Sequence, residues 1–117
     1  METRFYVNLG PIKLNEITQK LPCELKGLKS DKCFTSLLSI NDSNNNENTI
    51  SFIYESLKDN IKINPETTVV ISKKDKYNFP NLKRLILVDN VHIAVAILSN
   101  IFYQKIENSD IDFLSNN

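Results

Sequence analysis

The sequence predicts an α/β domain with a mixed five-stranded sheet flanked by helices. Strand-like and helix-like segments alternate along the chain, and this order is typical of the α/β class. The runs TTVVI at residues 67–71 and LILV at residues 85–88 show no polar alternation, which favours strands buried on both faces of a mostly parallel, helix-covered sheet. With 117 residues, the chain is long enough for one domain around a single core.

The first part of the chain predicts one helix and two strands. Leu14, Ile17 and Leu21 recur at helical spacing, and Pro22 stops the pattern. The helix, an alternating edge strand and a second strand are expected at residues 14–21, 23–27 and 32–40. An Asn-rich segment follows, and because Asn and Asp favour turns, we expect a loop inside the domain rather than a boundary.

The rest of the chain predicts three strands and two helices. The strands are expected at residues 49–54, 67–71 and 85–88, and the helices at residues 55–63 and 91–102. The second helix is expected to be the longest, with an apolar stripe toward the core. Asp89 or Asn90 can cap it, because short polar side chains accept hydrogen bonds from first-turn N–H groups.

Charge and composition argue against several classes of function. Lys and Arg total 14 and Asp and Glu total 14, so no net field favours nucleic acid. Cys23 and Cys33 are too few and too far apart for a zinc site, and each is expected to be a buried apolar residue. No secretory leader or membrane span is evident. We expect a cytoplasmic protein with no metal, no cofactor and no nucleic-acid partner.

The residues also predict no catalytic group. His92 is the only histidine, and it has no nucleophile or triad partner beside it apart from Asp89. Ser36, Ser39 and Ser51 lack the strand–turn–helix setting of a nucleophile elbow. We therefore expect no catalytic residue in the chain.

An ordered series of short segments resembles one known family. The segments are IKLNEI at 12–17, CELKG at 23–27, FTSL at 34–37, TISF at 49–52, TVVI at 68–71 and LVDNVHIA at 87–94. Over residues 5–104 the chain resembles the amino-terminal domain of UDP-3-O-acylglucosamine N-acyltransferase (LpxD), a lipid A enzyme. The order of the segments carries this resemblance, since no single motif is highly specific. The ligases that add amino acids to UDP-N-acetylmuramic acid begin with a similar domain, so a fragment of such a ligase is an open alternative.

The resemblance implies a uridine site whose rim lies within residues 41–56. In the family, a Phe and a Tyr sandwich the uracil while an Asn reads its edge. Phe52 matches that Phe, but Glu55 stands in place of the Asn, Leu57 in place of a Lys and Lys58 in place of the Tyr. Tyr54 offers a substitute ring, because alternate strand residues share a face. The candidate nucleotide-binding residues are Phe52, Tyr54, Glu55 and Lys58, with UDP-sugar binding weak or lost.

The resemblance also implies that the chemistry belongs to another domain. In the family, acyl transfer from acyl carrier protein and assembly into a trimer depend on a following β-helix of hexapeptide repeats. Glycine occurs only at Gly10 and Gly27 and no six-residue apolar period is present, so we expect these 117 residues to lack that β-helix and to be inactive alone. Residues 1–104 are expected to be the nucleotide-sugar-binding domain and residues 105–117 a polar tail. A degenerate, non-catalytic module for protein contacts is the alternative.

Overall fold

A five-stranded mixed sheet is the centre of the structure, a computed structural model that describes residues 6–54 and 63–105. Its strands, in spatial order, are β3 (Glu24–Lys26), β8 (Arg84–Val88), β7 (Thr68–Ser72), β6 (Thr49–Phe52) and β5 (Ser36–Leu37). The last four run parallel, and β3 is the antiparallel edge strand. The predicted mixed five-stranded α/β sheet is therefore confirmed, as is the edge position of the strand at residues 23–27.

The two central strands are buried, as their sequences predict. Val69, Val70 and Ile71 of β7 are all 0% exposed, and the aliphatic residues of β8 are 0–1% exposed. Their side chains alternate between two apolar clusters, so each strand contributes to both faces of the sheet.

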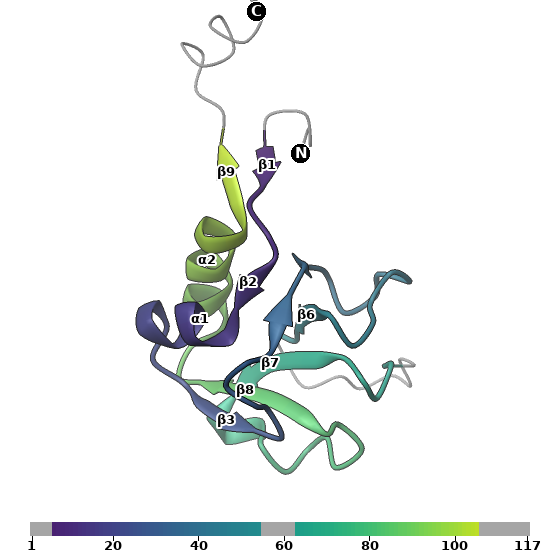
Figure 1. The fold of residues 1–117 in the computed structure, drawn as a ribbon. Helices are drawn as coiled ribbons and strands as arrows, with labels where there is room; N and C mark the ends of the chain where they lie inside the picture. Colours follow the sequence, from purple (N-terminus) through teal and green to yellow (C-terminus); the bar gives the residue numbers. More distant parts are fainter. Residues whose placement is uncertain (1–5, 55–62, 106–117) are drawn as a thin grey trace, which may run out of the picture.

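Two helices cover one face of the sheet (Figure 1). They are α1 (Leu14–Lys20) and α2 (Val91–Phe102), and α2 is the longer of the two. Leu14 and Ile17 of α1 and Leu98 of α2 pack with Val70 and Ile86 of the sheet in the larger cluster. Asn90 caps α2, since its side-chain oxygen accepts a hydrogen bond from the Ile93 N–H at 3.0 Å. Both predicted helices are thus confirmed in this part of the chain.

The opposite face of the sheet carries the smaller apolar cluster. In the described residues, this face packs against side chains from connecting segments: Ile53 and Leu82, together with the partly buried Ile40, Ile63 and Phe79. The only regular element in the β7–β8 connection is the short 3-10 helix η2 (Lys73–Asp75). The helix predicted at residues 55–63 lies outside the described residues, except for Ile63, which is not helical.

The single strand predicted at residues 32–40 is wrong, because two strands of different sheets take its place. β4 (Cys33–Phe34) pairs with β2 (Ile12–Lys13) in a small antiparallel ribbon, whereas β5 joins the main sheet. Thr35 separates them, and its N–H donates to the Asn48 carbonyl at 2.7 Å. Phe34 and Leu37 nevertheless both reach the larger apolar cluster, and β5 packs against α2.

A second ribbon joins segments from the two ends of the described chain. β1 (Tyr6–Asn8) pairs antiparallel with β9 (Tyr103–Lys105), and together they project beyond the sheet (Figure 1). The Leu9 N–H donates to the Phe102 carbonyl at 2.7 Å, so the ribbon continues directly from the last turn of α2.

Truncating a central strand should destabilise the fold strongly. Leu87→Ala removes a side chain that is 1% exposed, and the lost burial and the cavity together should lower the free energy of unfolding by about 2–4 kcal/mol. Leu25→Ala on the neighbouring edge strand is the matched control, because Leu25 is 40% exposed. Urea denaturation of both variants gives the comparison, and equal losses would contradict a central position for β8.

Candidate functional site

The carboxyl ends of three parallel strands meet at one edge of the sheet. Val70 of β7 lies in register with Phe52 of β6 on one side and with Ile86 of β8 on the other. β6 ends at this level, whereas β7 and β8 each continue for two more residues toward the same edge of the sheet. In open α/β sheets, ligands bind outside the carboxyl ends of the strands, which makes this edge the first place to look for a site.

Three aromatic rings gather at this carboxyl edge. The ring centroids of Phe52 and Tyr54 are 5.0 Å apart with their planes tilted by 49°. The Tyr54 ring also stacks on the imidazole of His92, at 4.1 Å and an interplanar angle of only 4°. Tyr54 is 44% exposed, and Phe52 is half-buried against the core. We call Phe52, Tyr54 and His92 the aromatic triad.

The short connection between β8 and α2 explains the position of His92. Only Asp89 and Asn90 separate the strand from the helix, and the Asn90 cap fixes where the first turn begins. His92 is in that first turn and is exposed, so its ring can reach Tyr54 across the end of β7.

The structure brings together only part of the predicted nucleotide site. Phe52 and Tyr54 are adjacent, as expected, whereas Glu55 and Lys58 lie outside the described residues. The sequence analysis excluded His92 as a catalytic residue and did not predict that its ring contacts Tyr54. Its place in the first turn after a buried strand was a usable signal, because that turn lies at the carboxyl edge of the sheet.

The spacing of the triad does not accommodate a base between Phe52 and Tyr54. A flat ring sandwiched by two others needs about 3.5 Å on each side, or about 7 Å in total. The two rings are 5.0 Å apart and tilted, so they contact each other directly. A base therefore cannot lie between these two rings as they stand, and Lys58, at the position of the family's second ring, lies outside the described residues.

Charged and thiol groups lie near the same edge. Lys73, which follows β7, pairs with Asp89, which follows β8, at 3.3 Å, and both side chains are well exposed. Burial raises the pKa of the Cys23 thiol, with the nearby Lys73 charge opposing the change. A raised pKa disfavours the nucleophilic thiolate, so Cys23 is poorly suited to covalent chemistry. Cys23 is half-buried, but Cys33 is exposed, which corrects the expectation that both cysteines are buried.

The Asn-rich loop is a hydrogen-bonded structure centred on Asn45. The Asn45 amide nitrogen donates to the carbonyls of Ser39 at 2.8 Å and Asp42 at 3.0 Å. Its side-chain oxygen accepts from the hydroxyls of Thr49 at 3.1 Å and Ser51 at 3.0 Å. The Asn45 side chain thus ties the loop to the start of β6, together with the Asn46 N–H, which donates to the Thr49 hydroxyl at 2.9 Å.

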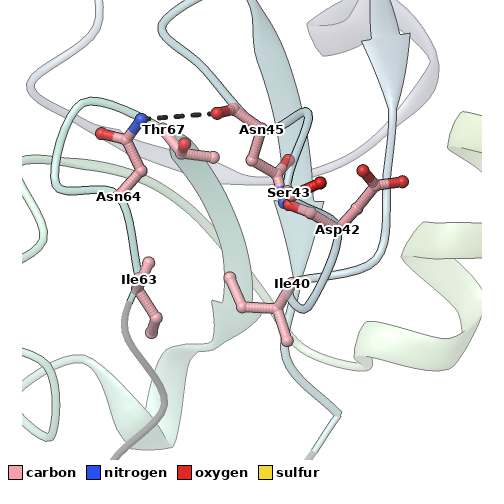
Figure 2. A pocket seen from close by; sticks show the side chains of 7 residues that line it. All are labelled: Ile40, Asp42, Ser43, Asn45, Ile63, Asn64 and Thr67. Atoms are coloured by element: carbon pink, nitrogen blue, oxygen red, sulfur yellow. Dashed lines mark hydrogen bonds between the residues drawn. The ribbon is translucent and has the colours of Figure 1, made fainter.

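This loop borders a small cavity at the opposite edge of the sheet from the aromatic triad. The cavity, of about 160 Å³, is lined by Ile40, Asp42, Ser43, Asn45, Ile63, Asn64 and Thr67 (Figure 2). The Asn64 side chain donates across it to the Asn45 carbonyl at 3.4 Å. Because Asn45 precedes β6 and Thr67 precedes β7, the cavity lies at the amino ends of these strands. The Asn-rich residues therefore do not line the aromatic edge, although the sequence predicted one continuous rim.

Metal-binding and membrane-spanning features are absent from residues 6–54 and 63–105. These residues contain no cluster of three or more His, Cys, Asp or Glu side chains that could hold a metal ion. None of the helices described in them is long and apolar enough to cross a bilayer. Comparison of the whole chain with protein-family models and with curated proteins finds no match.

Removing the Asn45 side chain should loosen the loop. Asn45→Ala deprives two carbonyls of a donor, while the Thr49 and Ser51 hydroxyls can still donate to the carbonyls of Asn46 and Leu38, so the change should cost about 1–3 kcal/mol of unfolding free energy. Asn44→Ala is the control, because Asn44 joins the loop's hydrogen bonds through main-chain atoms. Denaturation midpoints and amide exchange of Thr49 and Ser51 measure the effect. An Asn45→Ala protein as stable as the Asn44→Ala protein would refute the central role of Asn45.

Proposed function

We propose that this domain captures the nucleotide part of a UDP-sugar, weakly, at the carboxyl edge of β6, β7 and β8. The observation that carries the proposal is the aromatic triad, because exposed aromatic faces are what a flat base stacks upon. The resemblance to the amino-terminal domain of UDP-3-O-acylglucosamine N-acyltransferase supplies the identity of the ligand. The mixed sheet with its capped terminal helix is compatible with that resemblance.

Three features of the site argue for low affinity. The rings of Phe52 and Tyr54 are in contact, so a base has to stack on one side of the group. Lys73, the cation at this edge whose position is described, is already paired with the Asp89 carboxylate, which repels a diphosphate. At the position where the resembling family has an amide, which donates and accepts hydrogen bonds, this sequence has Glu55, whose carboxylate only accepts them.

A protein-contact module is the second candidate, and helix α2 favours it. The twelve residues of α2 include no charged side chain, although Ile93 is 60% exposed and Ala96 also faces solvent. A solvent-facing helix usually carries charges on its outer face. An uncharged, partly apolar outer face is better suited to a protein partner than to a diphosphate.

Titration with UDP tests the first candidate. We expect a dissociation constant of about 1 mM or weaker, corresponding to roughly −4 kcal/mol, with NMR shift changes concentrated at Ser51–Tyr54 and His92. Tyr54→Leu should weaken binding at least about fivefold, whereas Tyr77→Leu, at a tyrosine that is 84% exposed, should not. Shift changes elsewhere, or equal effects of the two variants, would reject a nucleotide site at this edge.

Acyl transfer should be absent from these 117 residues alone. The resemblance places the catalytic base and the acyl carrier protein contacts in a β-helix of hexapeptide repeats, and these 117 residues show no six-residue apolar period. Incubation with acyl-loaded acyl carrier protein and UDP-acyl-glucosamine should therefore give no amide product above the protein-free control. Product formation that depends on the chain would show that its own residues catalyse the reaction.

A further inference from the structure

The His92 imidazole lies on Tyr54 as a bound base would. Its ring is parallel to the phenol within 4° at a centroid distance of 4.1 Å, which is the geometry of a stacked planar ligand. One face of Tyr54 is therefore already covered, and Phe52 borders the same ring at 5.0 Å. A ligand that stacks on the covered face of Tyr54 has to displace His92.

Only the stacking contact is seen to hold the imidazole in this place. Among the residues that the structure describes, the His92 imidazole takes part in no hydrogen bond or ion pair, and it is exposed. Phe52 cannot move as easily, because it extends from β6 and packs against the larger core cluster. His92 is thus the member of the triad that can rotate into solvent without disturbing the fold.

We infer that the His92 side chain is a removable plug. Its imidazole covers the face of the Tyr54 ring on which a planar ligand would stack, and it thereby lowers the affinity of the site for that ligand. The identity of the ligand rests on the proposed function, but the plug itself rests on the ring geometry. A stacked aromatic pair contributes enough binding energy to change an equilibrium constant about two- to tenfold. A ligand that displaces the imidazole must break the His92–Tyr54 stack, so its affinity is lower by that factor. Removing the His92 ring should restore this affinity.

The opposite arrangement makes a contrary prediction. If a base stacks on the outer face of His92, the histidine extends the platform, and its removal weakens binding. The plug is favoured because Tyr54, two residues beyond β6, has the larger ring and contacts both Phe52 and His92, whereas the one ring contact of His92 in the described residues is with Tyr54. The sign of the His92→Ala effect separates the two arrangements.

The test compares three proteins under one titration with UDP. His92→Ala should bind UDP about two- to tenfold more tightly than the unsubstituted chain. Asn100→Ala, at an exposed residue near the other end of α2, should bind UDP as the unsubstituted chain does. Unchanged or weaker binding by His92→Ala would overturn the plug.

A readout without ligand tests the plug independently of the nucleotide. In the free protein, the carbon-bound protons of the His92 ring should be shifted upfield by the Tyr54 ring current, and Tyr54→Leu should abolish this shift. Absence of the upfield shift would overturn the plug whatever UDP does.

If none of the proteins binds UDP, the proposed function fails and adenosine replaces UDP as a planar probe without uracil. Adenosine should then perturb the Tyr54 ring resonances more strongly in His92→Ala than in the unsubstituted chain. An equal or smaller perturbation in His92→Ala would overturn the plug as well.

Discussion

In-register parallel pairing of β7 with β6 and β8 determines at which edge of the sheet the described residues beside these strands lie. Val70 stands level with Phe52 and Ile86, so the carboxyl ends of the three strands form one edge and their amino ends form the other. The aromatic triad and the Lys73–Asp89 pair lie at the carboxyl edge, and the Asn45 loop and its cavity lie at the amino edge. A one-residue slip of β6 would reverse its faces and move Phe52 away from the core cluster that it now contacts.

The two outer strands of this sheet, β5 and β3, are protected in different ways against pairing with a further strand. At one edge, the Tyr103 hydroxyl donates to the Leu37 carbonyl at 3.0 Å and accepts from the Leu37 N–H at 3.3 Å. One side chain thus satisfies the outward main-chain groups of Leu37 in β5, where another strand could otherwise add. At the other edge, the short strand β3 carries the exposed charges of Glu24 and Lys26. The Tyr103 contact also ties the end of α2 to the sheet, because Tyr103 directly follows that helix.

Elements with strong local patterns could be predicted from the sequence. The helical spacing from Leu14, the β-branched run of β7 and the Asn90 cap each act through neighbours in the chain, so their outcomes follow from local chemistry. The break at Thr35 could not be predicted, because both halves of the apolar run look like strand. Pairing of β4 with β2, far earlier in the chain, separates them.

In the candidate site, too, one contact follows from the local sequence and another from the long-range order of the strands. Phe52 and Tyr54 are two residues apart, and their proximity follows from the strand repeat. The His92 contact depends on β7 lying between β6 and β8, and no local pattern encodes that order. The contact joins the residues that follow β6 to the first turn of an uncharged helix, so stacked rings and the exposed Lys73–Asp89 pair lie at the same edge. Such an edge favours stacking over ionic recognition, because a phosphate group of any ligand there would first have to compete with Asp89 for Lys73. The base, rather than the diphosphate, would therefore carry most of the recognition.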